Sequence, residues 1–122
     1  TDNLYSVYFE NSNVGWIVGE NVRILKSTDR GSSWTEQIAN PPFPVDLRSV
    51  QFQNLNDGWA VGHYMYSSTG YDSYIIKTTN GGTTWENNSV FMDEKLFSVF
   101  FCEHQFRFPF RIRNSKNNGW RI

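Results

Sequence analysis

The side chains of this sequence that could perform acid–base chemistry are twelve Asp and Glu residues and two histidines. Hydrolysis of a glycoside needs two carboxyl groups that face one cleft, and the acidic residues here are scattered along the chain. Asp93 and Glu94 are adjacent, but they precede a predicted strand, so we interpret them as a solvated turn. His63 and His104 lie far apart, without the spacing of metal ligands. The sequence therefore predicts no catalytic residues, no metal site and no cofactor.

One acidic residue, Asp29, lies in a motif that occurs twice, as KSTDRGSSW (26–34) and KTTNGGTTW (77–85). A carboxylate in a tight turn accepts hydrogen bonds from the backbone N–H groups that follow it, and a glycine two positions later adopts positive φ at little cost. Asn80 replaces Asp29 in the second copy, and a carboxamide accepts the same bonds but cannot act as a catalytic carboxylate. Both copies are therefore predicted to be structural hairpin turns, formed by Ser27, Asp29, Gly31 and Trp34, and by Thr78, Asn80, Gly82 and Trp85.

These turns belong to a longer internal repeat. The stretches LYSVYF (4–9), LRSVQF (47–52) and LFSVFF (96–101) match one another, and GWIVG (15–19) and GWAVG (58–62) follow the first two. The first two units are offset by 43 residues up to Gly62, but by 51 residues in the turn motif. The second unit therefore carries an eight-residue insertion between Gly62 and Ile75.

Each unit is predicted to form four short strands, because apolar residues alternate, β-branched and aromatic residues are frequent, and turn residues separate the segments. In the first unit we expect strands at 4–9, 16–19, 22–26 and 34–37. Four strands in about 40 to 50 residues is the size of one β-propeller blade. The predicted fold is all-β, one partial propeller domain over 1–122 with about two and a half four-stranded antiparallel blades, at 4–38, 47–88 and, incomplete or irregular, 96–122.

The pattern Ser-x-Asp-x-Gly-x-x-Trp resembles the Asp-box, or BNR repeat, of sialidase-type β-propellers. In more detail, GWAVG followed by IIKTTNGGTTW is similar to the photosystem II stability/assembly-factor family. The resemblance covers residues 4 to about 101 and implies that the Asp-boxes are structural. It further implies an extracytoplasmic setting, secreted, periplasmic or similar to the thylakoid lumen, and in phototrophs a role in assembling photosystem II.

The alternative within this superfamily is a sialidase-type glycoside hydrolase or a glycan-binding propeller. Sialidases carry a Phe/Tyr-Arg-Ile-Pro motif, which Phe106-Arg107-Phe108-Pro109 nearly matches. The match fails because Phe108 replaces Ile and because the segment follows the two turn motifs instead of preceding them. We therefore expect residues 106–113 to form a strand with aromatic and Arg side chains on opposite faces, and no enzyme.

The composition excludes several other classes of protein. The net charge of −1 gives no case for nucleic acid as a partner, and no apolar run approaches the length of about 20 residues that a membrane span needs. Cys102 is the single cysteine and is interpreted as a buried apolar residue. A signal peptide and a starting Met are absent, which we interpret as a processed product or a piece of a longer secreted or envelope protein.

A binding surface is expected on the edge of the sheets opposite the turn motifs, where two irregular segments lie. One is residues 40–46, and the other is the insertion at 63–74, which holds four of the six tyrosines. Loops on a rigid scaffold concentrate binding function, and tyrosine provides large contact area with a polar tip. The candidate binding residues for a protein partner or glycan are Phe43, His63, Tyr64, Tyr66, Tyr71 and Tyr74. A lengthened hairpin whose tyrosines pack on one another remains the alternative.

The third unit departs from the repeat after Phe101, where residues 102–117 intervene before Trp120. This segment is either an insertion that forms an extra strand or an artefact at the end of a longer repeat protein. Closed propellers have about 4 to 8 blades, so open blade edges and faces favour self-association. The sequence thus predicts a non-enzymatic scaffold for binding or assembly.

Overall fold

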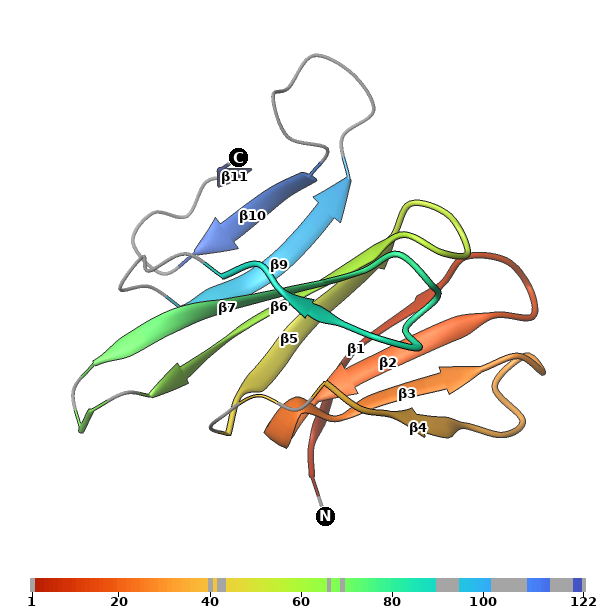
Figure 1. Cartoon of the computed structure of the whole chain (residues 1–122), viewed down its shortest axis with the longest axis horizontal. Coiled ribbons are helices and arrows are strands. Elements are labelled where there is room, and N and C mark those ends of the chain that lie inside the picture. Colours follow the sequence, from red (N-terminus) through yellow and green to blue (C-terminus); the bar gives the residue numbers. More distant parts are fainter. Residues whose placement is uncertain are drawn as a thin grey trace.

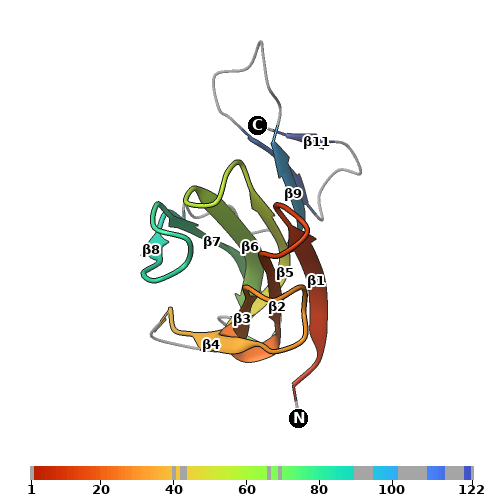
Figure 2. The same cartoon turned by 90° about the vertical axis from the view of Figure 1, so that its right-hand side faces the viewer.

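The computed structural model of the chain describes residues 2–39, 41, 44–65, 67–68, 70–89, 95–101, 110–114 and 120–121. These residues form three antiparallel sheets side by side (Figure 1). The first strands of consecutive sheets are neighbours, and the sheets fan out from them (Figure 2). The prediction of an all-β fold with four-stranded antiparallel blades is confirmed for the first two sheets.

The strands of the first blade follow one another in the order of the chain. They are β1 (Leu4–Phe9), β2 (Gly15–Gly19), β3 (Ile24–Ser27) and β4 (Thr35–Gln37), with a short 3-10 segment, η1 (Glu20–Val22), before β3. The third strand therefore begins two residues later than predicted, because Asn21 and Val22 adopt positive φ angles of 54° and 58°. Such angles belong to a turn and not to a strand.

The second blade repeats this order with β5 (Asp46–Phe52), β6 (Gly58–Met65), β7 (Tyr71–Thr78) and β8 (Glu86–Asn87). Most of the insertion extends β6 and β7 into a longer hairpin, which confirms the hairpin of the alternative interpretation and not an irregular segment. His63 pairs with Ser73, and Met65 pairs with Tyr71. The aromatic residues of the insertion favour this outcome, since they suit a pleated, half-buried surface.

The third sheet has the order β11-β10-β9 and consists of β9 (Leu96–Phe101), β10 (Phe110–Asn114) and β11 (Trp120–Arg121). β10 takes the position beside β9 that β2 and β6 have in the first two blades. Residues 102–109, which include Cys102, His104 and the near match to the sialidase motif, lie outside the described residues, as do Asp93 and Glu94.

The two glycines of the repeated Gly-Trp-x-Val-Gly stretch make room for neighbouring groups. A Cβ on Gly58 would lie 2.5 Å from the ring of Phe52, which is its partner across β5 and β6. A Cβ on Gly62 would collide with the carbonyl oxygen of Asp46. The motif is therefore explained by close packing within a blade.

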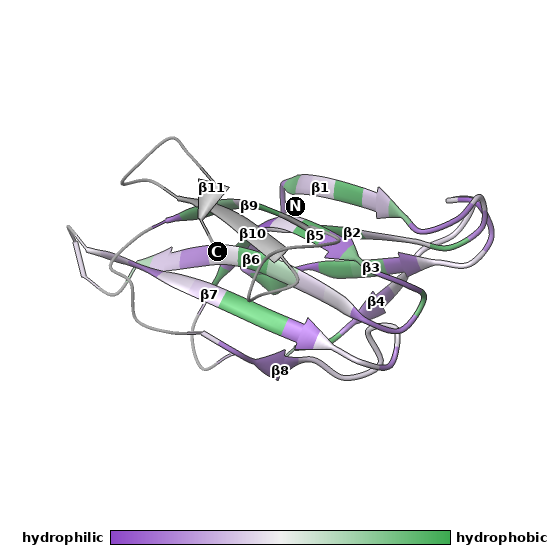
Figure 3. Ribbon diagram, turned by 90° about the horizontal axis from the view of Figure 1, so that it is seen from above, coloured by the Kyte–Doolittle hydropathy of each residue, from purple (hydrophilic) through white to green (hydrophobic). Residues whose placement is uncertain are grey.

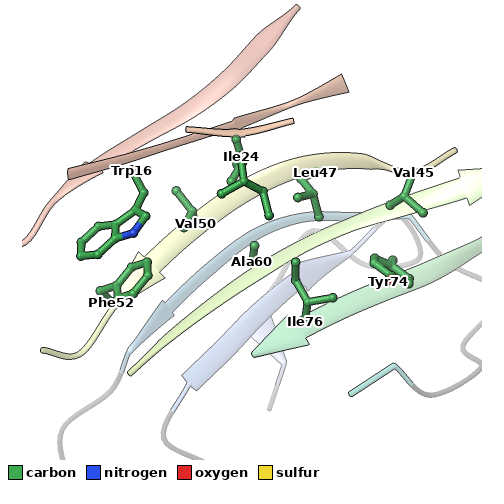
Figure 4. Close-up of a cluster of buried hydrophobic side chains, with 10 residues drawn as sticks. Trp16, Ile24, Val45, Leu47, Val50, Phe52, Ala60, Tyr74 and Ile76 are labelled. Carbon is green, nitrogen blue, oxygen red and sulfur yellow. The ribbon is translucent and has the colours of Figure 1, made fainter. Parts of the chain in front are cut away.

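The main core lies between the first two blades. The indole of Trp16 stacks on the ring of Phe52 with centroids 3.5 Å apart and an interplanar angle of 9° (Figure 4). Both residues are almost fully buried. The core also contains Val18, Ile24, Val45, Leu47, Val50, Ala60, Tyr74 and Ile76. A smaller cluster of Val61, Ile75, Leu96 and Val99 joins the second and third sheets.

Candidate functional site

The first repeated turn, residues 27–34, is held by the side chain of Asp29. Its Oδ1 accepts hydrogen bonds from the backbone N–H of Ser33 at 2.9 Å and from Ser27 Oγ at 2.8 Å, and its Oδ2 accepts one from Ser33 Oγ at 2.6 Å. The bonds from Ser33 and Ser27 lower the pKa of Asp29 to about 2. The carboxylate is thus engaged in stabilising the turn.

The second repeated turn, residues 78–85, has the same geometry without a charge. Asn80 Oδ1 accepts hydrogen bonds from the backbone N–H of Thr84 and from Thr78 Oγ1, both at 2.9 Å. Asn80 Nδ2 donates to Thr84 Oγ1 at 2.8 Å, so this hydroxyl accepts where the hydroxyl of Ser33 donates. A rotatable hydroxyl therefore lets Asp and Asn fill one position.

The conserved geometry of the turns extends to their glycines and tryptophans. Gly31 and Gly82 have φ angles of 88° and 92°, which favour glycine. Trp34 packs edge-to-face against Phe9 with centroids 6.0 Å apart, and Trp85 packs in the same way against Phe52 at 6.0 Å. In each blade, the tryptophan of the turn between the third and fourth strands thus packs on the phenylalanine that ends the first strand. The turns lie at the end of the sheets where hydrophilic loops gather (Figure 3).

A pocket of about 340 Å³ lies at the opposite edge of the second blade. It is formed where β5 and β7 begin, where β6 ends, and just before β9. The pocket is lined by Pro44, Asp46, Arg48, His63, Tyr64, Met65, Tyr71 and Lys95. Three of the six candidate binding residues, His63, Tyr64 and Tyr71, therefore come together at one pocket.

His63 lines this pocket and is nearly buried among aromatic side chains. Its ring packs edge-to-face against Tyr71 and Phe97, with centroids 5.9 Å away in both cases, and its Nδ1 lies 3.4 Å from the carbonyl oxygen of Leu96. Burial lowers the pKa of His63, and the positive charges of Arg48 and Lys95 lower it further. The imidazole is therefore neutral at pH 7.

Two cations of the pocket lie against aromatic rings. The guanidinium carbon of Arg48 is 3.9 Å from the ring centroid of Tyr5, and Lys95 Nζ is 3.8 Å from that of Tyr71. Cations at such distances are attracted to the ring face. Neither residue was predicted from the sequence. A signal for Arg48 exists, because it occupies the repeat position that Tyr5 and Phe97 fill in the other units.

Tyr64 and Tyr74 both contact the main core. Tyr64 donates a hydrogen bond of 3.2 Å to Asp72 Oδ2 and packs against the main core. Tyr74 is 3 % exposed and belongs to that core, and burial raises its pKa. Phe43 and Tyr66 lie outside the described residues.

Neither a metal site nor a spanning helix is found in the part of the chain that the structure describes. There, no group of three or more His, Cys, Asp and Glu side chains could hold a metal ion. Within the same residues, no helix has the length and apolar character needed to cross a membrane.

The fold and the repeated turns define a class, the β-propellers built from BNR-type repeats. A family model described as "Photosynthesis system II assembly factor YCF48" matches residues 1–98, and the chain belongs to this family. The suspected resemblance is thereby confirmed.

A solved structure supports the same fold. The structure titled "YCF48 bound to D1 peptide" matches with a TM-score of 0.69 at 18 % sequence identity, and the match covers 99 % of this chain and 40 % of that chain. The chain thus spans less than half the length of that relative, and the predicted partial propeller is confirmed. No curated protein matches the sequence.

Proposed function

We propose that this chain is a non-enzymatic assembly scaffold that binds a peptide segment of a photosystem II protein. The observation that carries the proposal is the pocket at the edge away from the repeated turns. Its lining includes the aromatic residues His63, Tyr64 and Tyr71 and the cationic residues Arg48 and Lys95. Aromatic residues and arginine are the side chains enriched where proteins bind one another.

The family and the structural relative favour a peptide as the ligand. The family is described as an assembly factor, and the relative is titled as bound to a D1 peptide. These descriptions concern other proteins, and they support a peptide partner for the pocket of this chain.

The chemistry of the pocket suits a polypeptide. Met65 and Phe97 lie beside it and are 57 % and 43 % exposed, which provides apolar contact area for side chains. Arg48 and Lys95 donate hydrogen bonds and Asp46 accepts them, as the carbonyl and amide groups of a peptide require.

The same pocket argues against glycoside hydrolysis. Asp46 is the one carboxylate among the described residues that line it, whereas hydrolysis uses two. Asp29 is engaged within its turn, at the other edge of the sheets. We therefore propose that the repeated turns act as structural Asp-boxes and that the chain performs no catalysis.

The test is a binding titration with a fluorescently labelled D1 peptide, followed by anisotropy. We expect Arg48→Gln and Tyr71→Ser to weaken binding at least about tenfold, as expected for residues that anchor a ligand. Arg30→Gln is the matched control, because Arg30 lies in the first repeated turn, at the opposite edge. Arg30 is exposed and its Nε donates to Asn13 Oδ1 at 3.2 Å, so this variant should bind normally.

Two outcomes would overturn the proposal. One is unchanged peptide binding by folded Arg48→Gln and Tyr71→Ser proteins. The other is displacement of the peptide by a sialylated or neutral oligosaccharide at lower concentration than by unlabelled peptide, which would favour the glycan-binding alternative. Circular dichroism of each variant establishes that the sheets are intact.

The setting and the assembly state are further parts of the proposal. We propose an extracytoplasmic location, secreted or in the cell envelope, which rests on the family resemblance. Self-association through the open edges of the blades is also proposed, because unpaired strand edges favour pairing with another chain. Sedimentation of the purified chain over a range of concentrations tests this point.

A further inference from the structure

The two repeated turns differ in the residue pair at their centre. In the first turn Asp29 is followed by Arg30, and in the second Asn80 is followed by Gly81. An Asn-Gly pair can lose ammonia without an enzyme, because the backbone nitrogen of the glycine attacks the carboxamide carbon of the asparagine. Glycine favours this attack, since it has no side chain to hinder the approach. The second turn therefore contains a reactive pair, and the first turn has the acidic residue type that the reaction produces.

The reaction at this pair requires only water. The nitrogen of Gly81 forms a bond to Cγ of Asn80, and Nδ2 leaves as ammonia with the proton of the attacking amide. Water then opens the resulting succinimide to Asp, or to isoaspartate in which the chain runs through the former side-chain carbon. Asn80 is exposed, so water reaches its side chain.

The hydrogen bonds of the folded turn oppose this attack. Asn80 Oδ1 accepts from the backbone N–H of Thr84 and from Thr78 Oγ1, both at 2.9 Å, and its Nδ2 donates to Thr84 Oγ1 at 2.8 Å. The attacking N–H of Gly81 donates instead to the carbonyl oxygen of Asn56 at 2.9 Å. The succinimide ring can therefore close only after the turn has opened locally.

The first blade restrains the same peptide group from the other side. The carbonyl oxygen of Gly81 accepts hydrogen bonds from Trp16 Nε1 at 3.2 Å, Lys26 Nζ at 3.1 Å and Gln37 Nε2 at 3.3 Å. Gly81 itself is buried. Opening of the turn at Gly81 would separate its carbonyl from these donors. The contact between the two blades thus adds to the free energy that opening requires.

The first turn shows how the Asp product would be held. Asp29 Oδ1 accepts the backbone N–H of Ser33, and its Oδ2 accepts Ser33 Oγ at 2.6 Å. In the second turn Thr84 has the place of Ser33, and rotation of its hydroxyl would let it donate to a carboxylate. Isoaspartate adds a carbon to the backbone of the turn and cannot keep this geometry.

We propose that Asn80 is a deamidation site whose reaction is controlled by the contact of the first blade with the second repeated turn. When that contact opens, Asn80 converts to Asp, and the turn then closes with the hydrogen bonds of the first turn. The product adds one negative charge to the net charge of −1. The site lies at the edge of the sheets that carries the repeated turns, so the proposal does not depend on the peptide pocket.

The test is to incubate the purified chain at mildly alkaline pH, below its thermal transition, and to follow deamidation by mass spectrometry of its digested peptides. We expect Asn80 to react at least about tenfold more slowly in the native chain than in urea, because the native reaction requires local opening. The other Asn-Gly pair of the sequence, at 118–119, is the reference in urea, where the two pairs should react alike.

Two lysines at equivalent repeat positions provide a matched pair of variants. Lys26 Nζ lies 5.4 Å from the ring centroid of Trp16, and Lys77 Nζ lies 5.0 Å from that of Trp59. Lys26 also donates to Gly81. Lys26→Met should therefore speed native deamidation at Asn80 by about two- to tenfold, as expected for one lost hydrogen bond. Lys77→Met should leave the rate unchanged.

Three results would overturn the proposal. One is equal rates at Asn80 in the native chain and in urea, since the turn would then give no protection. Another is equal native rates for folded Lys26→Met and Lys77→Met proteins, and Gln37→Leu, which removes a further donor to Gly81, serves if Lys26→Met does not fold. The third is a clear fall in the urea midpoint of Asn80→Asp at pH 7, because the product would then not be held as Asp29 is.

Discussion

The indole N–H of Trp16 in the first blade donates a 3.2 Å hydrogen bond to the carbonyl oxygen of Gly81 in the second. Gly81 belongs to the second repeated turn, so this turn has two structural tasks. Asn80 holds it together from within, and its carbonyl at Gly81 accepts donors from the neighbouring blade. The second repeated turn therefore has a structural role, because it links the first blade to the second.

Replacement of Trp16 by alanine should destabilise the protein strongly. The side chain is fully buried and stacked on Phe52, so its loss leaves a cavity and removes a donor from Gly81. We expect the free energy of unfolding to fall by about 3 to 5 kcal/mol, as for other buried aromatic residues. Urea denaturation of Trp16→Ala, followed by circular dichroism, measures the loss.

The matched control is Trp59→Ala, at the equivalent position of the second blade. Trp59 is partly exposed and packs beside the smaller core cluster, so its removal should cost clearly less. Equal losses of unfolding free energy for the two variants would show that the contact of Trp16 with the second blade adds no extra stability.

Replacement of Asp29 should depend on what takes its place. Asp29→Asn should keep most of the stability at pH 7, because Asn80 already fills the equivalent position with a reversed hydroxyl partner. Asp29→Ala should lower the melting temperature, since the N–H and hydroxyl of Ser33 lose their acceptors. A thermal melt of both variants checks this, and an equal loss in both would contradict it.

At low pH, wild-type protein with Asp29 should no longer be more stable than the Asp29→Asn variant. The pKa of Asp29 is lowered to about 2, from 3.8 for the group in an ordinary environment. Its contribution is fully present above about pH 4 and is lost as the pH falls through the folded-state pKa. The melting temperature of wild type should therefore approach that of Asp29→Asn between pH 4 and pH 2.

The repeat made much of the fold predictable from the sequence. The Leu-x-Ser-Val-x-Phe and Gly-Trp-x-Val-Gly stretches mark β1, β2, β5 and β6, because the close packing around their glycines recurs in the first two blades. The start of β3 was placed too early, since positive φ is common for Asn, as at Asn21, but is not expected for the β-branched Val22. The insertion was expected to be either an irregular binding loop or a lengthened hairpin, and it extends the pairing of β6 with β7 as the second interpretation predicted.

The candidate site was predictable only in part. The strand order predicts which edge of the sheet carries the site, and three of the predicted residues line the pocket at that edge. Tyr74 is a core residue, which the two-residue alternation with Ile76 indicates. Arg48 and Lys95 escaped notice because the pocket is made by the ends of strands that lie far apart in the sequence.

The stability of the protein should fall in mild acid because of His63. Burial keeps the folded-state pKa of this imidazole below its ordinary value of 6.5. Below about pH 6.5 the unfolded chain therefore binds a proton at His63 that the folded chain does not, and the free energy of unfolding decreases until the folded-state pKa is reached. The slope from this residue is at most about 1.4 kcal/mol per pH unit.

The measurement is urea denaturation at pH 7.5, 6.5 and 5.5. His63→Gln should show a flatter dependence on pH than wild type, while the acidic residues contribute equally to both. If the two dependences coincide, the imidazole takes up its proton as readily in the fold as in the unfolded chain.

Substitution of equivalent glycines should reveal how differently the two blades are packed. A Cβ on Gly58 would lie 2.5 Å from the ring of Phe52, which is held between Trp16 and Trp85 and cannot move aside. Gly58→Ala should therefore cost about 1 to 3 kcal/mol of unfolding free energy, as overpacking of a core does. A Cβ on Gly15 would lie 2.7 Å from the ring of Phe9, which is 39 % exposed and can give way. Gly15→Ala should thus cost less in urea denaturation, and an equal cost would mean that the ring of Phe9 is held as firmly as that of Phe52.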